Sequence, residues 1–417
     1  MKWNGMGRGL KATAVSLAVG LGMTACSRDY TVAYLYVTAA TKTTTGAISA
    51  YAVDYQAGTL QQLADSPIPS GGSNPVTLVA SPNAKYIYVV NHDTSTVVQF
   101  DIGTDGKLYP QAPTTSVVQG SNGIIGTFPT AAAIDPTGAF LYVTFTYQSG
   151  FTTARPGPGG VAIFPINSSN GNLGTPVVNT TVGTTAANPL PYVPVGNNPS
   201  AIVVSPKGGF VYVVDQEKPT SGSSNGVLLA FTASTSTGAL TPIAGTVSGG
   251  FAAGVQPGGI AEDPSGRFLY VTDSLTNQLF GYTVTNGGKP SPMVTSPFTT
   301  GQYPLGVTVD PRGSFLYVAN FGSSTIGAYA IDTTTGSLSG AAGGSQVGPQ
   351  PTCVTIEPAL GIYLYSSNNT DNTVSGAQLD PHTGALKQVQ GTPYASQPLP
   401  TCAVAVANGV HATQLIY

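Results

Sequence analysis

Charged residues are scarce in this sequence, since Asp, Glu, Lys and Arg make up only 7% of its 417 residues. The 14 basic residues are scattered singly and the formal net charge is -3, so no basic patch is available to neutralise a phosphate backbone. Nucleic acid is therefore not an expected partner. The three histidines, His92, His382 and His411, lie far apart in the sequence, and we predict no metal site and no cofactor.

The abundant residues indicate short strands and many turns. The chain has 53 Gly and 33 Pro together with many Thr, Ser and Asn, and these residue types favour β-strands joined by tight turns. At 417 residues the chain is too long for one ordinary hydrophobic core. It must contain several domains, a large barrel, or an array of repeats in which each unit packs on its neighbours.

Residues 1–25 are predicted to be a targeting signal rather than part of the fold. Three basic residues flank the start of a short apolar stretch over 12–23, and Met23-Thr24-Ala25-Cys26 resembles the lipobox of bacterial lipoproteins. An ordinary cleaved signal is the alternative, whereas so short a stretch cannot cross about 30 Å of hydrocarbon as a helix. We expect lipidation at Cys26, a short tether over 26–30, and an exported protein, either periplasmic or anchored in the outer membrane. The membrane is expected to be contacted only through the lipid.

One strand pattern centred on a tyrosine occurs seven times, at spacings of 47 to 70 residues. The tyrosines are Tyr36, Tyr88, Tyr142, Tyr212, Tyr270, Tyr317 and Tyr365. Two prolines precede each tyrosine from Tyr88 onward, with a small apolar segment between them. We call this segment strand A and the tyrosine segment strand B, because a Pro-x-Gly turn joins the two in most copies.

Each copy continues with an alternating segment, strand C, and a glycine signal that opens a short strand D. The signal is Gly-x-Leu at Gly58, Gly106, Gly171, Gly238, Gly336 and Gly384, whereas the fifth copy has Gly287-Gly288-Lys289. The first copy has no strand A, but residues 400–406 at the other end of the chain repeat the strand A pattern. Donation of this segment to the first copy closes a ring and removes the exposed edges of an open array.

The sequence therefore predicts an all-β fold for residues 31–417. We expect a seven-bladed β-propeller of four-stranded antiparallel blades, closed by the C-terminal strand completing blade one. Residues 411–417 look strand-like but have no predicted place.

This repeat resembles the Tyr-Val-Thr-Asn repeat propellers and the wider seven-bladed lactonase family, which includes 6-phosphogluconolactonase and the muconate-cyclising enzyme. The only tryptophan is Trp3, in the signal, which distinguishes the chain from propellers whose blades are docked by tryptophan. The resemblance implies a catalytic pattern in blade four, with Gly-Pro-Arg-His before strand A and Asn-Glu after strand B. This sequence instead has Asn198-Pro199-Ser200-Ala201 and Asp215-Gln216, so the Arg, His and Glu are missing.

Lactone hydrolysis requires a group that activates water and a group that stabilises the oxyanion. The A strands begin with small or neutral side chains, such as Thr130, Ser200 and Cys353. Such side chains cannot act as a base unaided. The sequence therefore favours a protein that has lost this activity over an enzyme.

Loop length varies on one face of the predicted ring. The A–B and C–D turns are uniformly short, whereas the B–C and D–A connections are longest around blades three and four, over 108–129, 147–159, 173–199 and 216–225. Variation confined to one face is typical of a binding surface, although drift in unconstrained loops gives the same pattern.

Candidate binding residues lie at this face and at the mouth of the central channel. Ser200 and Gln216 occupy positions of the missing catalytic pattern, and His92 in a B–C loop is either a lone acid or ligand, or an exposed loop residue. Five further residues lie three positions after a repeat tyrosine: Asn91, Asp215, Asp273, Asn320 and Asn368. They form either a ring for a sugar or cation, or caps for their own turns.

Cys353 and Cys402 occupy the same position in the A strands of blades seven and one, which are neighbours where the ring closes. An exported protein keeps disulfides, and the pair can bridge if its Cα atoms lie within about 7 Å. Two small buried thiols fit the same place otherwise.

Fold does not by itself determine function. The first hypothesis is a lipid-anchored, monomeric propeller that binds a protein or glycan of the cell envelope through the B–C and D–A loop face over blades three and four. The alternative is a lactonase-like hydrolase, similar to 6-phosphogluconolactonase, with a degenerate or relocated site. A purely structural envelope protein is a third class.

Overall fold

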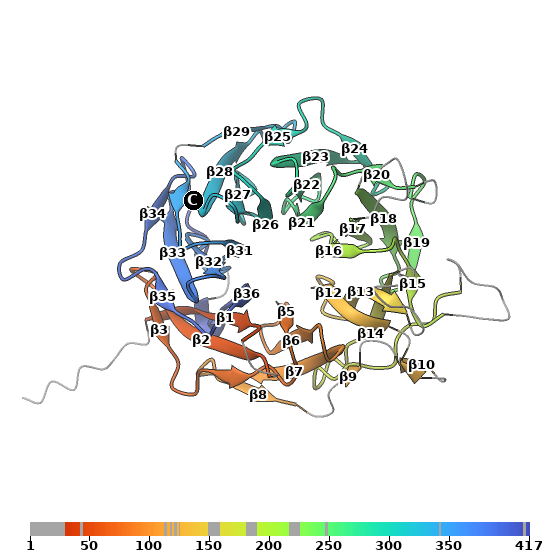
Figure 1. The fold of residues 1–417 in the computed structure, drawn as a ribbon, viewed down its shortest axis with the longest axis horizontal. Coiled ribbons are helices and arrows are strands. Elements are labelled where there is room, and N and C mark those ends of the chain that lie inside the picture. Colours follow the sequence, from red (N-terminus) through yellow and green to blue (C-terminus); the bar gives the residue numbers. More distant parts are fainter. Residues whose placement is uncertain are drawn as a thin grey trace, which may run out of the picture. The chain divides into compact units, whose positions relative to one another are not determined.

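The computed structural model describes residues 30–41, 45–111, 115–116, 119–120, 123–124, 126–148, 159–180, 190–216, 226–246, 249–341, 343–411 and 414–417. Thr31–Tyr417 form one compact unit, in which the described strands make seven blades around a central axis (Figure 1). Each blade is an antiparallel sheet whose strands A, B and C follow one another outward from the axis. The predicted fold class is confirmed.

The A strands lie nearest the axis and contain the short apolar segments. For blades one to seven they are β36 (Pro400–Ala407), β5 (Pro75–Ala80), β12 (Gly126–Ile134), β16 (Pro199–Val204), β21 (Pro257–Glu262), β26 (Pro304–Val309) and β31 (Pro351–Ile356). The B strands, which carry the repeat tyrosines, are β1 (Thr31–Ala39), β6 (Tyr86–Asn91), β13 (Phe140–Gln148), β17 (Phe210–Asp215), β22 (Phe268–Asp273), β27 (Phe315–Asn320) and β32 (Tyr363–Asn368). Every residue of β6, β22, β27 and β32 is buried, because neighbouring blades cover both faces of the sheet.

The C strands are β2 (Ala47–Asp54), β7 (Thr96–Ile102), β14 (Gly160–Pro165), β18 (Val227–Ala233), β23 (Gln278–Val284), β28 (Thr325–Ile331) and β33 (Thr373–Leu379). Their outer partners are β3 (Leu60–Gln62), β8 (Leu108–Pro110), β15 (Val193–Pro194), β19 (Leu240–Pro242), β24 (Pro290–Pro292), β29 (Leu338–Gly340) and β34 (Leu386–Gln388). Among the described residues, a second short segment also pairs with strand C in every blade except the third: β4 (Ile68–Pro69), β9 (Thr115–Ser116), β20 (Phe251–Ala252), β25 (Phe298–Thr299), β30 (Ser345–Gln346) and β35 (Tyr394–Ala395). Outside the blades, β10 (Gln119–Gly120) pairs with β11 (Gly123–Ile124), and η1 (Gly409–His411) is a short 3-10 helix.

Ring closure occurs as the sequence predicted. Strand β36 pairs antiparallel with β1, with Val404 opposite Tyr36 and Ala405 opposite Leu35, and Figure 1 shows these two strands side by side in blade one. The backbone groups of β1 are therefore paired on both sides, by β36 and by β2.

The repeat tyrosines join each blade to the next. Each hydroxyl donates a hydrogen bond to the carbonyl oxygen of a glycine in the C–D turn of the following blade, at 2.6 to 3.2 Å. The pairs are Tyr36 with Gly106, Tyr88 with Gly171, Tyr142 with Gly238, Tyr212 with Gly288, Tyr270 with Gly336, Tyr317 with Gly384, and Tyr365 with Gly58. The last pair joins blade seven to blade one, so the chain of bonds passes through every blade.

Glycine is required at the acceptor end of these bonds. The seven glycines have positive φ, from 64° at Gly58 to 77° at Gly106. A Cβ at Gly336 would lie 2.4 Å from the ring of Phe268, and one at Gly58 would lie 2.2 Å from the ring of Tyr363. An aromatic residue two positions before each tyrosine thus packs on the glycine that the tyrosine binds, and Gly288 fills this place in blade five without the Gly-x-Leu signal.

The C-terminal tail had no predicted place, and its described residues lie against blades one, seven and six. The Asn408 N–H donates to Val32 O at 2.9 Å, and the Ile416 N–H donates to Leu360 O at 3.0 Å. Arg312 of blade six donates to Ile416 O at 2.7 Å. The guanidinium also pairs with Asp310 at 2.7 Å and is only 5% exposed. The tail is therefore bound to three consecutive blades at the ring closure.

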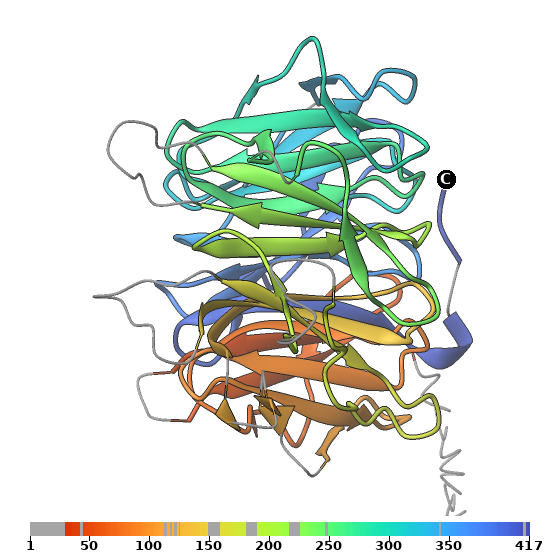
Figure 2. The ribbon, with the colours of Figure 1, turned by 90° about the vertical axis from the view of Figure 1, so that its right-hand side faces the viewer.

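Strand direction divides the propeller into two faces. The A–B and C–D turns form one face, which we call the turn face; it includes η1 and lies to the right in Figure 2. The B–C and D–A connections form the opposite face, where the A strands begin, and we call it the mouth face.

Candidate functional site at the channel mouth

Seven residues surround the axis where the A strands begin. Each directly precedes an A-strand proline; they are Asn74, Phe128, Asn198, Gln256, Tyr303, Gln350 and Leu399, and we call them the mouth ring. In most blades the carbonyl of the mouth-ring residue accepts the N–H of the residue four positions after the repeat tyrosine, as in His92 to Asn74 at 2.9 Å and Phe321 to Tyr303 at 2.9 Å. Sequence reasoning missed this ring, although its place directly before a recurring proline could have revealed it.

The small residues at the start of the A strands link adjacent blades. Thr130 Oγ1 donates to Pro199 O at 2.6 Å, Ser200 Oγ donates to Pro257 O at 2.9 Å, and Thr401 Oγ1 donates to Pro75 O at 2.7 Å. Gln216 Nε2 also donates to Pro257 O, at 2.8 Å. The two side chains at positions of the missing catalytic pattern, Ser200 and Gln216, are thus both bonded to one backbone carbonyl.

The five residues that follow the repeat tyrosines by three positions lie beneath the mouth ring, and at most 2% of each is exposed: Asn91, Asp215, Asp273, Asn320 and Asn368. Asp273 accepts the N–H groups of Val255 and Gln256 at 2.8 and 2.9 Å. Asp215 accepts the N–H of Asn198 at 3.0 Å. These bonds hold the D–A connections in place, which is the geometry that turn capping requires.

The three Asn residues of this set also hydrogen-bond to other side chains of the protein. Asn91 Oδ1 accepts the Ser70 hydroxyl at 2.9 Å, and Asn368 Nδ2 donates to Thr373 and Ser375 at 2.9 Å each. Asn320 Nδ2 donates to Thr325 Oγ1 at 3.1 Å. The structure therefore brings the five residues to one level of the ring, and each of them hydrogen-bonds to a partner within the protein.

His92 has a carboxylate partner at the rim of the mouth. Its Nδ1 lies 2.6 Å from Asp93 Oδ1, which also accepts Asn74 Nδ2 at 3.2 Å. Burial raises the pKa of Asp93, but the hydrogen bonds from His92 and Asn74 outweigh that effect and hold the pKa below its ordinary value. The His92 side chain is 30% exposed, and its ring packs on Phe128 with centroids 5.0 Å apart.

A second aromatic group lies in blades five and six of the mouth. The rings of Tyr303 and Phe321 are 5.6 Å apart, and Gln256 Nε2 reaches the Tyr303 hydroxyl at 3.4 Å. Tyr303 is 37% exposed. The described mouth thus presents the Tyr303 ring next to the Gln256 amide, and the Phe128 ring next to the His92 ring.

Glu262 is the one charged residue within the seven described A strands, and it lies at their opposite end, next to the turn face. Its Oε1 accepts the Ser205 hydroxyl at 3.1 Å, while its buried Oε2 has no hydrogen-bond partner in the structure. Burial raises the pKa of this carboxyl to about 8; the Ser205 hydrogen bond lowers it, and the Asp263 charge adds to the rise. Sequence reasoning missed Glu262, although a carboxyl in an otherwise uncharged strand position is a visible signal.

Two cavities hollow the turn face near the ring closure. One of about 450 Å³ lies between blades one and two and is lined by residues that include Tyr34, Lys85 and Asn408. The other, of about 650 Å³, is lined by residues at the ends of A strands and by Pro358. The candidate binding residues predicted from the sequence lie instead on the mouth face.

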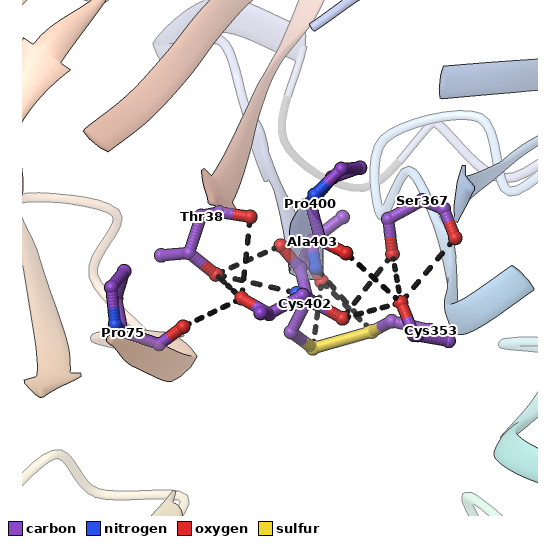
Figure 3. The surroundings of a disulfide bond; sticks show 9 residues. Thr38, Pro75, Cys353, Ser367, Pro400, Cys402 and Ala403 are labelled. Atoms are coloured by element: carbon purple, nitrogen blue, oxygen red, sulfur yellow. Dashed lines mark hydrogen bonds between the residues drawn. A yellow bond between two sulfur atoms is a disulfide. The ribbon is translucent and has the colours of Figure 1, made fainter. Parts of the chain in front are cut away.

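The ring closure also holds a disulfide. Cys353 of β31 and Cys402 of β36 are bonded, with Cα atoms 5.0 Å apart (Figure 3). Thr352 Oγ1 donates to Thr401 O at 2.7 Å beside the bond. Covalent and hydrogen bonds therefore join the A strands of blades seven and one at the mouth.

Several predicted features lie partly or wholly outside the described residues. These are Cys26 and the signal and tether, and the longest mouth-face loops, within 149–158, 181–189 and 217–225. His382 lies in a C–D turn and His411 in η1, both on the turn face and far from His92. Among the described residues, no group of three His, Cys, Asp or Glu side chains is placed to hold a metal ion. None of the described helices is long and apolar enough to cross a membrane.

Comparison with known proteins identifies relatives of this architecture. The family described as lactonase, seven-bladed β-propeller, matches residues 25–144 and 243–356. A search of curated proteins found no match.

Solved structures share the fold at low identity. A putative 6-phosphogluconolactonase from Bacteroides uniformis is 19% identical, with a TM-score of 0.67 over 90% of this chain and 100% of that one. The periplasmic gluconolactonase PpgL of Pseudomonas aeruginosa is also 19% identical, with a TM-score of 0.65 over 90% of this chain and 99% of that one.

Proposed function

Because this chain belongs to the lactonase family of seven-bladed β-propellers, we propose that it is an exported, lipid-anchored member that binds a glycan at its channel mouth. The binding residues are the mouth ring and the B–C loops beside it. The anchor is Cys26, as the lipobox-like sequence indicates.

The observation that carries this proposal is the chemistry of the mouth. Asn74, Asn198, Gln256 and Gln350 provide amide donors and acceptors suited to sugar hydroxyls, and Tyr303 provides a partly exposed ring. An aromatic ring offers a flat apolar surface to the CH face of a sugar. A neutral glycan matches this combination better than an ionic ligand does, because the mouth ring carries no charge.

The catalytic positions of the family support binding over turnover. Ser200 and Gln216 both donate to Pro257 O, so their polar groups already hold two blades together. Neither side chain can take a proton from water near neutral pH.

Calorimetric titration of the mature protein with a panel of envelope oligosaccharides tests the proposal. We expect Tyr303→Ala to weaken binding at least about tenfold, because the stacking surface is lost. Tyr109→Ala is the matched control, since Tyr109 is 50% exposed in strand β8 near the turn face. Absence of binding across the panel, or an equal loss in both variants, would contradict a glycan site at the mouth.

Lactone hydrolysis is the second candidate, and the contact between His92 and Asp93 favours it. With Nδ1 bonded to the carboxylate at 2.6 Å, Nε2 of a neutral His92 is left to accept a proton from water. Attack of that water on a lactone carbonyl, cleavage of the ring C–O bond and return of the proton to the leaving oxygen would give the open hydroxy acid. The naming of the Pseudomonas aeruginosa neighbour as a gluconolactonase makes sugar lactones the first substrates to test.

A lactone panel distinguishes the two candidates. Turnover at ordinary enzymatic rates that is abolished by His92→Ala, and retained in the turn-face control His382→Ala, would replace the binding proposal with hydrolysis. We expect both variants and the parent to be equally inactive.

A further inference from the structure

The chain enters the propeller on the turn face. Strand β1 is a B strand, so it begins on the turn face at Thr31. Asn408, which lines the cavity between blades one and two, donates through Nδ2 to Thr31 O at 2.9 Å. An anchor attached to the residues before Thr31 is therefore connected to the turn face, beside the ring closure.

The tether is too short to let the propeller move far from its anchor. Only residues 26–30 separate the lipidation site from Thr31. A fully extended chain of this length spans at most about 18 Å, which is less than the distance across a propeller of this size. A propeller anchored at Cys26 must therefore stay next to the bilayer.

Exposed aromatic side chains occur on this same face. Tyr55, in the C–D turn of blade one, is 37% exposed, Tyr417 is 80% exposed, and Tyr109 follows the C–D turn of blade two. Tyrosine is enriched where proteins meet the lipid headgroups, because its ring is apolar and its hydroxyl is polar.

Charged side chains of both signs also lie on this face. The Lys and Arg residues that the structure describes all lie in A–B or C–D turns or just after them: Lys85, Lys107, Lys207, Arg267, Lys289, Arg312 and Lys387. Ten carboxylates lie in or beside the same turns: Asp54, Asp101, Asp105, Asp135, Glu262, Asp263, Asp310, Asp332, Glu357 and Asp380. The face therefore has no net positive charge, and the short tether and the aromatic side chains are what favour its contact with lipid.

We propose that the turn face, centred on blades one and two, docks against a lipid bilayer, so that the channel mouth points away from the membrane. This inference rests on the lipid anchor of the proposed function, but not on the identity of the glycan. It adds a direct protein contact to the anchor, and it leaves the mouth open to soluble or distant ligands.

The test uses full-length lipidated protein in vesicles of phosphatidylethanolamine and phosphatidylglycerol. A fluorophore is attached through Lys85→Cys on the turn face or Asp371→Cys on the mouth face; both positions are exposed, and the native Cys353–Cys402 pair is already bonded. Quenching by lipids with spin-labelled headgroups should be at least about threefold stronger at position 85 than at position 371, because quenching requires contact with the headgroups. Equal quenching at both positions, or stronger quenching at 371, overturns the proposal.

Surface variants separate docking from tethering. The triple change Tyr55→Ser, Tyr109→Ser and Tyr417→Ser should reduce the ratio of quenching toward one, whereas Leu275→Ser with Tyr303→Ser on the mouth face should leave it unchanged. An unchanged ratio in the triple variant would show that the tether alone orients the protein, and would overturn the docking contact. Mass spectrometry of residue 26 measures separately whether the anchor is present. An unmodified Cys26 overturns both the proposed anchor and this inference. The calorimetric test of glycan binding does not depend on that result.

Discussion

Single side chains join neighbouring blades, and the repeat tyrosine is the main side chain of this kind. Its ring is buried among residues of two blades, and its hydroxyl bonds a backbone carbonyl that no strand pairing satisfies. A buried carbonyl without a partner costs free energy, so tyrosine and not phenylalanine is needed at this position. The acceptor must be glycine for the separate reason that its φ is positive and an aromatic ring lies against it.

Removal of one such hydroxyl should therefore destabilise the protein measurably. We expect Tyr270→Phe to lower the free energy of unfolding by about 1–2 kcal/mol, because Gly336 O loses its donor. Urea unfolding followed by fluorescence measures the change. Tyr109→Phe is the control, and its exposed hydroxyl should contribute less than about 0.5 kcal/mol. Equal effects in the two variants would mean that the ring, and not the hydrogen bond, makes the junction.

Glu262 is a second residue whose contribution to stability can be measured, in this case from its dependence on pH. Its pKa is raised to about 8 in the folded protein from an ordinary 4.5, so the folded state holds a proton that the unfolded state releases between these values. The stability that this proton provides is complete below pH 4.5 and is lost as the pH rises through about 8. We expect the parent to lose about 4 kcal/mol more than Glu262→Gln between pH 5 and pH 8.5, since the amide cannot ionise. Parallel stability curves for the two proteins would show that the carboxyl is charged at both pH values.

At the scale of elements, the closure between β31, β36 and β1 combines three kinds of bond. Backbone pairing joins β36 to β1, the disulfide joins β36 to β31, and Arg312 holds the described end of the tail after β36. The disulfide and Arg312 lie on opposite faces, so the closing strand is held at both ends. This explains how one strand that is distant in sequence can complete a blade stably.

The disulfide should stabilise the folded protein mainly by restricting the unfolded chain. Its cysteines are 49 residues apart, and cross-linking a loop of this length reduces the entropy of the unfolded state. We expect the Cys353→Ser, Cys402→Ser double variant to lose about 2–4 kcal/mol of unfolding free energy in urea. Reductant should lower the stability of the parent to that of the variant and leave the variant unchanged. A reductant effect on the variant would contradict this assignment.

At the scale of the whole molecule, the propeller is a closed ring with two chemically different faces. The described mouth face presents amides and aromatic rings around the axis, and the turn face presents the described cations, most of the described carboxylates and the entry point of the chain. A ring that depends on one closing strand should fold as a unit or not at all.

Deletion of residues 400–417 removes that strand and exposes the edge of β1. We expect the truncated protein to lose its cooperative thermal transition and to aggregate, as judged by calorimetry and size-exclusion chromatography. Deletion of residues 414–417 alone removes the bonds of Gln414 and Ile416 to blade seven and should keep a cooperative transition at lower temperature. A cooperative, monomeric 400–417 deletion would show that six complete blades suffice.

The sequence alone determined the repeat, the number of blades, the order of strands and the closing segment, because each depends on local signals that recur along the chain: the B-strand tyrosine, the paired prolines and the turn glycine. It also located Cys353 and Cys402 at equivalent positions. Only the tertiary structure decided which partners these residues meet. The acceptor of Tyr36 is 70 residues away, the Asp93 that orients His92 is a neighbour whose direction depends on Asn74, and the Glu262 carboxyl is buried by another blade. Hydrogen bonds and burial between blades depend on the ring as a whole. The sequence of a single repeat therefore does not predict them.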